Sequence, residues 1–507
     1  MKNPFKKLNL RQLALMCCMF FLIISCKKDD KKISFTFLQL NDVYEIAPIQ
    51  GGKFGGLARV ESVHKTLLKE NKNTLLFMAG DFLNPSLIGS LKVNGERIRG
   101  KQMIEVMNAM NFDLVAFGNH EFDLPYKDFQ KRLNESTFSW VGGNVSHNDS
   151  LKRPFHKKVN SQIEYIPETF IKKLTDDDGT SIKVGFVSVC IPSNPKDYVV
   201  YDHMFKKVKA NYEALKDSVD VVFGLTHVKI TNDKRIAKLL PEIPLIMGGH
   251  EHTNMRIETE NGVITKADAN AKTTYIHRIL FDKETKEITI NSELKEINNS
   301  IKPDKKVDSI VGKWQSILTT EISKVISKPN EVIYSSTIPL DGRDTPIRSE
   351  QTNLGEVITE SMSFVFDNKV DCALVNGGSI RIDDQLVGAI TPMDIFRVLP
   401  FGGAIVKVKI KGRLLKRVLD YGELASGTGA YLQRFNTNKV GDTWYINNQK
   451  INLNKTYIAA FSDYLLKGFD IPFLSPENKE VYSVYHPKED EMAYDIRKAV
   501  VSYLKTK

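Results

Sequence analysis

The stretch LVAFGNHEFD, residues 114–123, runs from four apolar residues into a glycine, an amide, an imidazole and two carboxylates. Similar short apolar runs alternate with longer stretches of helical spacing through the N-terminal half of the chain. They are ISFTFLQL (33–40), TLLFMA (74–79), KVGFVSV (183–189), VVFGLT (221–226) and IPLIMGG (243–249). Near-continuous apolar runs between helices are typical of strands buried on both faces. The sequence therefore predicts a layered α/β core.

Ligand-type side chains follow these runs, at the point where each predicted strand ends. In α/β sheets, ligands bind at the carboxyl ends of the strands. A mixture of carboxylate, imidazole and amide groups suits Zn, Mn or Fe(II). Two such cations, about 3.5–4 Å apart, can clamp a phosphate and hold the attacking hydroxide. The residues at these strand ends are Asp42, Asp81, Asn119, His120, Asp123, His227, His250 and His252.

Each of these residues has a simpler explanation when it is taken alone. An aspartate after a strand is most often a helix N-cap or a turn residue. Together, however, they agree in residue type, in position after a strand and in order along the chain, and this agreement favours a two-metal hydrolytic site. Five further histidines lack such a setting and are interpreted as ordinary surface or core residues: His64, His147, His156, His203 and His277.

The motifs ND, GD, GNHEFD, LTH and GGHEH, in this order, resemble those of the calcineurin-type metallophosphoesterases, and of their 5′-nucleotidase branch in particular. The resemblance implies an N-terminal four-layer α/β/β/α domain, a linker helix and a C-terminal α/β nucleotide-binding domain. It implies a first metal ion bound by Asp42, Asp81 and His252. It implies a second metal ion bound by Asp81 as a bridging ligand, Asn119, His227 and His250. His120 and Asp123 resemble the family's catalytic dyad, in which the carboxylate orients the imidazole.

Tyr44 departs from the family pattern, which carries a histidine ligand of the first metal ion at this position. A phenol with a pKa near 10 is a poor ligand for a divalent ion at neutral pH. Three interpretations follow. The favoured one is that Tyr44 turns away and leaves water in that position. Alternatively, it binds Fe(III) as tyrosinate, or it packs structurally while the first metal ion binds weakly.

A second group of residues lies in the C-terminal half. An aromatic residue such as Phe401 could equally belong to the core, and Arg381 to the surface, when each is considered singly. Taken together, six residues of this half resemble the substrate-binding set of the 5′-nucleotidases. The resemblance implies that Phe401 and Tyr464 sandwich a base, that Asp470 binds the ribose, and that phosphate or sugar is held by Arg348, Asn376 and Arg381. Phe469 stands where the family usually has glycine.

Changes in pattern divide the chain into five segments. Residues 1–25 resemble a bacterial lipoprotein signal peptide, with an N-terminal anchor helix as the alternative. A polar tether follows over 26–32. The metallophosphoesterase domain covers 33–300, and an amphipathic linker helix is predicted within 301–328. The C-terminal substrate-binding domain covers 329–507.

The signal resemblance makes Cys26 the lipidated first residue of the mature chain. The KKDDKK stretch that follows looks like an export tag of Gram-negative surface lipoproteins. We therefore expect a protein of the cell envelope, anchored by lipid to the outer membrane or facing the periplasm. Cys190 and Cys372 lie in apolar runs far apart in the sequence and are predicted to be free buried thiols.

The formal net charge of +10 does not indicate a nucleic-acid partner. Four of the cations lie in the first 25 residues, which leaves 67 basic and 61 acidic residues, and the lysines are scattered. The predicted function is metal-dependent hydrolysis of nucleoside 5′-monophosphates, in nucleotide scavenging. The alternatives are hydrolysis of UDP-sugars or 2′,3′-cyclic nucleotides, and a catalytically weak surface nucleotide-binding lipoprotein. No oligomeric state is predicted.

Overall fold

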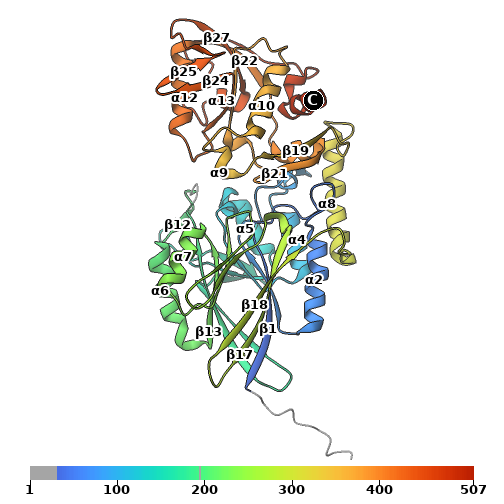
Figure 1. Cartoon of the computed structure of the whole chain (residues 1–507), viewed down its shortest axis with the longest axis vertical. Helices are drawn as coiled ribbons and strands as arrows, with labels where there is room; N and C mark the ends of the chain where they lie inside the picture. The colour runs from blue at the N-terminus through green and yellow to red at the C-terminus, as the bar shows by residue number, and fades with distance from the viewer. Residues whose placement is uncertain (1–30, 193–195) are drawn as a thin grey trace, which may run out of the picture.

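The computed structural model describes residues 31–192 and 196–507, which form two lobes stacked along the long axis of the molecule (Figure 1). The predicted signal peptide and the lipidation site Cys26 lie outside the described residues. In the described ranges, no helix has both the length and the apolar character needed to span a bilayer.

Two six-stranded sheets form the centre of the N-terminal lobe. The first has the order β18-β17-β1-β2-β5-β6, and the second has the order β10-β11-β13-β14-β16-β15. The first comprises β1 (Lys32–Leu40), β2 (Thr74–Ala79), β5 (Leu114–Ala116), β6 (Ser139–Val141), β17 (Thr273–Asp282) and β18 (Ile288–Glu296). The second comprises β10 (Thr169–Thr175), β11 (Ser181–Cys190), β13 (Val221–His227), β14 (Leu245–Gly249), β15 (Met255–Glu258) and β16 (Val263–Lys266).

Side-chain alternation along β1 explains why both of its faces are buried. Phe35 and Phe37 point into the cluster between the two sheets, whereas Leu38 and Leu40 belong to the cluster on the outer face. The Phe37 ring lies 4.8 Å from Phe77 of β2 and 5.0 Å from Phe223 of β13, measured between centroids. Aromatic edge contacts of this kind hold the two sheets together.

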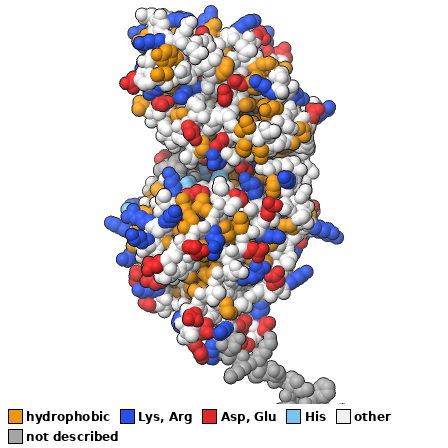
Figure 2. Space-filling view, in the orientation of Figure 1, with side chains coloured by type: hydrophobic (Ala, Val, Ile, Leu, Met, Phe, Trp, Pro, Cys, Tyr) orange, Lys and Arg blue, Asp and Glu red, His pale blue; other side chains and the backbone are white. Residues whose placement is uncertain are grey.

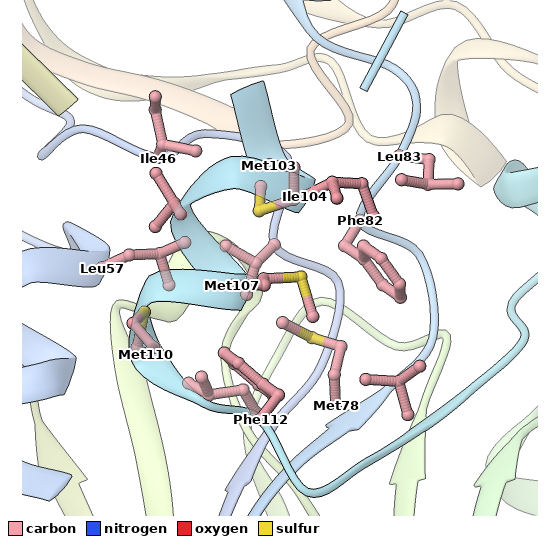
Figure 3. Packing of buried hydrophobic residues seen from close by; sticks show 14 of the residues in the cluster. Ile46, Leu57, Met78, Phe82, Leu83, Met103, Ile104, Met107, Met110 and Phe112 are labelled. Atoms are coloured by element: carbon pink, nitrogen blue, oxygen red, sulfur yellow. The ribbon is translucent and has the colours of Figure 1, made fainter. Parts of the chain in front are cut away.

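Helices cover the outer faces of both sheets. The first sheet is covered by α2 (Leu57–Glu70) and α4 (Lys101–Met110), and the second by α6 (Met204–Leu215) and α7 (Ile230–Leu239). Met103, Met107 and Met110 of α4 belong to this outer cluster together with Met78 of β2 (Figure 3). The order helix, sheet, sheet, helix confirms the predicted four-layer fold.

The helix α8 (Lys305–Ser323) lies beside α2 and α4 and leads to the C-terminal lobe (Figure 1). Asp304 caps its first turn by accepting the backbone N–H groups of Lys306 and Val307, each at 3.1 Å. Its buried side chains recur every three or four residues and are Val307, Val311, Trp314, Leu318 and Ile322. This helix lies within the range predicted for the linker.

The C-terminal lobe has its own five-stranded sheet, in the order β23-β20-β27-β22-β28. Alternate residues of β20 pack into two separate hydrophobic cores. Ala373 and Val375 pack under α10 (Asn353–Phe364) and α14 (Ile496–Leu504), whereas Leu374 packs under α12 (Gly412–Leu424). The strands are β20 (Cys372–Asn376), β22 (Ile405–Lys411), β23 (Leu432–Phe435), β27 (Thr456–Ser462) and β28 (Val481–Tyr485).

A two-stranded ribbon of β19 (Tyr334–Asp341) and β21 (Gln385–Ile390) lies on the side of this lobe that faces the N-terminal domain (Figure 1). The two cysteines of the described chain, Cys190 and Cys372, are buried and unpaired, which confirms the expectation of free thiols.

Candidate metal centre and adjacent cleft

The strand ends of the N-terminal lobe converge in the waist between the lobes, where histidine side chains are visible (Figure 2). β1, β2 and β5 run parallel in one sheet, and β13 and β14 run parallel in the other. Asp42, Asp81 and His250 follow their strands with φ angles of 53°, 57° and 84°. Non-glycine residues rarely adopt this left-handed conformation, and it is enriched at functional sites.

Asp42, Asp81 and His227 form the centre of the group. Their ligand atoms all lie within 4.8 Å of one another, and all three side chains are buried. His227 Nδ1 donates to the carbonyl oxygen of Ala79 at 2.7 Å. This hydrogen bond leaves Nε2 as the coordinating nitrogen, 3.0 Å from Asp81 Oδ2.

Three polar atoms in this group are buried without a hydrogen-bond partner: Asp42 Oδ1, Asn119 Oδ1 and His227 Nε2. Leaving such an atom unpaired costs about 1–3 kcal/mol. All three are lone-pair donors, and a divalent cation would satisfy each of them. The residues present therefore fit a metal centre.

The part of the centre nearest the C-terminal lobe contains His252 and Tyr44. His252 Nε2 lies 3.4 Å from Asp42 Oδ1 and 3.2 Å from the Tyr44 hydroxyl. The same hydroxyl lies 3.4 Å from Asp81 Oδ2. The favoured expectation that Tyr44 turns away is therefore wrong, because its hydroxyl points into the centre. Burial, followed by the charge of Asp81, raises the pKa of Tyr44 well above its usual value, so the group is a neutral phenol.

The other part of the centre contains Asn119 and His250, which line a cavity of about 400 Å³ together with Asp81. Burial lowers the pKa of His250 to about 3. The imidazole is thus neutral, which is the form that binds metals. The structure brings all six sequence-predicted metal ligands to this one place.

His120 lines the same cavity, and Asp123 contacts the His120 ring. His120 Nδ1 donates to Asp123 Oδ2 at 2.7 Å, and that oxygen also accepts from Arg381 Nη2 at 2.8 Å. Burial opposes protonation of His120, but the charges of Asp81 and Asp123 outweigh it and raise its pKa to about 9. A cationic imidazole in this position suits an anionic substrate.

Two glycines permit the close packing of the ligand loops. A Cβ atom on Gly118 would lie 2.1 Å from Asp81 Oδ1, and one on Gly249 would lie 2.2 Å from the carbonyl oxygen of Ala79. Neither contact is sterically possible. The glycine at each position is therefore required for the neighbouring ligands to approach one another.

A larger cavity, of about 750 Å³, opens in the C-terminal lobe. Asn376 donates to Asp470 at 2.7 Å, and the Tyr464 hydroxyl lies 3.4 Å from the same carboxylate. The Phe469 ring lies 5.3 Å from the Tyr464 ring and is 67% exposed, so it extends the aromatic wall. The cavity is lined by every residue predicted to bind substrate, namely Arg348, Asn376, Arg381, Phe401, Tyr464 and Asp470.

Two protein-family models match the chain. Residues 35–254 match the calcineurin-like phosphoesterase model, and residues 332–475 match the 5′-nucleotidase C-terminal domain model. The chain belongs to the 5′-nucleotidase branch of the calcineurin-like phosphoesterases. It is therefore a metallophosphoesterase-type hydrolase.

Curated relatives agree with this assignment. The human 5′-nucleotidase is 26% identical over 415 residues, which cover 75% of this chain and 68% of that protein. The Bacillus subtilis endonuclease YhcR is 27% identical over 446 residues, which cover 82% of this chain and 34% of that protein. The crystal structure of a 5′-nucleotidase precursor from Thermus thermophilus has the same fold, with a TM-score of 0.67 and 20% identity, and the match covers 94% of this chain and 96% of that one.

Glu121 is a residue of this 5′-nucleotidase-family centre that sequence reasoning missed. Its Oε2 accepts the backbone N–H groups of Gly118 at 2.6 Å and Asp81 at 2.9 Å. Its Oε1 accepts those of Phe82 at 2.7 Å and Leu83 at 3.1 Å. One buried carboxylate thus joins the two ligand loops. Its position between His120 and Asp123, inside the motif, was the available signal.

Lys266 was also missed. Its side chain is fully buried at the end of β16 and donates to the carbonyl oxygens of Val228 at 2.6 Å and Gly249 at 2.7 Å. These residues adjoin His227 and His250. Asp233 Oδ2, at 2.8 Å, and Glu251 neutralise the buried ammonium. Lys266 therefore holds in place the two loops that carry His227 and His250.

Proposed function

We propose that this protein hydrolyses nucleoside 5′-monophosphates to nucleoside and phosphate. The observation that carries the proposal is the combination of aromatic rings and arginines in the cleft next to the metal centre. The Nε atoms of Arg348 and Arg381 are buried there without a hydrogen-bond partner. Unpaired guanidinium donors in a cleft suit phosphate oxygens.

Each part of the site has a role in this proposal. Phe401 and Tyr464 are 64% and 40% exposed in the cleft and offer ring faces to a base. Asp470 offers a carboxylate to the ribose hydroxyls. His120, held by Asp123, places a positive charge where the phosphate would lie. When bound, the two metal ions would supply an activated water and neutralise the phosphate charge.

The first metal ion would be held by Asp42, Asp81 and His252, and the second by Asp81, Asn119, His227 and His250. These mixed oxygen and nitrogen ligands suit Zn, Mn or Fe.

We also propose that the protein acts at the cell envelope as a lipid-anchored enzyme of nucleotide scavenging. The support is the lipoprotein-like signal before Cys26. Removing phosphate converts a charged nucleotide into a neutral nucleoside, which is the form that a transporter can accept more readily across a membrane.

The test is phosphate release from AMP, UMP, UDP-glucose and cyclic AMP, with the metal content per chain measured on the same preparation. Release from the two monophosphates is expected. A chelator should abolish it, and re-added Zn, Mn or Fe should restore it. Release that persists after metal removal would contradict the proposed mechanism.

The substrate panel also separates the alternatives. Preference for UDP-glucose, or for 2′,3′-cyclic nucleotides added to the panel, would reassign the substrate within the family. Nucleotide binding without turnover, even by the fully metal-loaded protein, would overturn the hydrolase proposal in favour of a binding protein.

A further inference from the structure

A loop of the C-terminal lobe enters the metal centre of the N-terminal lobe. The loop lies between β20 and β21 and carries Asp383, which is 8% exposed. Asp383 has a φ of 44°, a left-handed conformation that it shares with Asp42, Asp81 and His250. Tertiary contacts must hold a non-glycine residue in this conformation.

Asp383 contacts His252 through two different groups. Its backbone carbonyl oxygen accepts from His252 Nδ1 at 2.6 Å, which leaves Nε2 as the coordinating nitrogen. Its carboxylate Oδ2 lies 3.1 Å from that same Nε2. Because Nε2 is also 3.4 Å from Asp42 Oδ1, the Asp383 carboxylate lies on the side of the imidazole where the first metal ion would bind.

The Asp383 carboxylate is also held in place. Its Oδ1 accepts the backbone N–H of Asp344 at 2.6 Å, while Oδ2 remains directed at the centre. Asp383 lines the same cavity as Asp81 and His252. The neighbouring Asp384 turns elsewhere and accepts from Lys272 Nζ at 2.9 Å. Of these two adjacent carboxylates, one faces the metal centre, and the other accepts from Lys272 across the lobes and from the backbone N–H of Gln385.

We propose that Asp383 is a ligand of the first metal ion, supplied by the substrate-binding lobe, with Asp42, Asp81 and His252. Its carboxylate adds a second oxygen group to the side of the centre where Tyr44 offers a hydroxyl. Its carbonyl orients the His252 ring. The first metal ion would therefore join the two lobes. This inference rests on the metal centre of the proposed function and adds a ligand to it.

Zinc binding to the whole chain tests this inference, with Asp383→Asn as the variant and Asp384→Asn as the matched control. Asparagine tolerates the left-handed backbone and keeps an oxygen for the Asp344 N–H, so the fold should be retained. In competition with a chromophoric chelator, we expect Asp383→Asn to weaken one of the two zinc sites at least tenfold. Asp384→Asn, which removes the ion pair with Lys272 and keeps an oxygen for the backbone N–H of Gln385, should bind both ions as the wild type does. Equal zinc affinities for Asp383→Asn and the wild type would overturn the proposal.

Two further readouts do not depend on catalysis. The visible spectrum of the cobalt-loaded wild type should change when Asp383 is replaced, because the ligand set of one ion changes. Zinc should also slow amide hydrogen exchange over residues 382–386 in the wild type and in Asp384→Asn, but not in Asp383→Asn. An identical cobalt spectrum, or equal zinc protection in all three proteins, would count against the proposal.

Phosphate release from AMP by the same zinc-loaded wild type separates the two proposals. If the wild type binds two ions and Asp383→Asn loses one, the ligand assignment stands whether or not AMP is hydrolysed. If AMP is hydrolysed but zinc binding is unchanged in the variant, only the ligand assignment fails.

Discussion

Phe469 adds an aromatic ring to the cleft at a position where the family usually has glycine. Its ring stands beside Tyr464 at 5.3 Å between centroids, with the planes inclined by 41°. It is 67% exposed and therefore free to meet a ligand. The cleft thus has three aromatic rings, Phe401, Tyr464 and Phe469, above the polar pair Asn376 and Asp470.

We expect Phe469→Gly to raise KM for AMP about twofold to tenfold with little change in kcat. The physical reason is the loss of an aromatic contact worth about 0.5–1.5 kcal/mol. Steady-state kinetics with AMP measure the effect, and ribose 5-phosphate, which lacks a base, serves as the control. An equal rise in KM for ribose 5-phosphate would show that the residue supports the pocket and does not contact the base.

At the scale of elements, β1 connects the two sheets at the end that carries the metal ligands. Gln39 Nε2 donates to the carbonyl oxygens of Gly248 at 3.1 Å and Thr265 at 2.9 Å, both in the second sheet. Gln39 Oε1 accepts from His277 Nε2 of β17 at 3.0 Å. Burial, with a smaller contribution from the charge of Arg256, lowers the pKa of His277 to about 3. The neutral imidazole is therefore part of the structure that aligns the sheets.

The stability of the N-terminal domain should depend on pH through His277. Between its unfolded pKa of about 6.5 and its folded pKa of about 3, only the unfolded chain takes up the proton. The stabilising effect of His277 is thus complete above pH 6.5 and declines as the pH falls. In urea unfolding, the stability difference between wild type and His277→Gln should shrink by about 1.4 kcal/mol from pH 7.5 to pH 5.5. A difference that stays constant over this range would refute the assignment of a neutral buried histidine.

The whole molecule places the metal centre between two lobes joined by charged contacts. Arg381 reaches Asp123 at 2.8 Å, and Arg397 Nε reaches Glu45 at 3.3 Å. The metal cavity and the nucleotide-sized cleft are lined by different residues. The contact between Arg381, which lines the cleft, and Asp123, which holds His120, therefore connects the two sites across the lobes.

The start of β1 at Lys32 lies at the end of the N-terminal lobe farthest from the C-terminal lobe (Figure 1). If the chain is lipidated at Cys26, the cleft would face away from the membrane. We expect the protein to incorporate labelled palmitate and to partition into the detergent phase. Cys26→Ser should abolish both, whereas Cys190→Ser should change neither, since Cys190 is buried in the fold. Unchanged labelling of Cys26→Ser would exclude this anchor.

Local patterns in the sequence were enough to predict the layered α/β class, a helix within residues 301–328 and the residues that meet at the candidate metal centre. These features depend on local order, because apolar runs define strands and a ligand after each strand must lie at the sheet edge. The aromatic and arginine residues of the cleft were predicted from the family resemblance, because they lie in recognisable local motifs.

The direction of Tyr44 and the contacts of Glu121, Lys266 and Asp383 emerged only from the folded structure. Each depends on partners distant in the sequence or on the course of the backbone. Asp383 meets His252 across 131 positions, and Lys266 is buried only because Asp233 and Glu251 neutralise it. Apart from the position of Glu121 inside its motif, local sequence patterns carry no signal for such contacts, because carboxylates and lysines are ordinarily solvated.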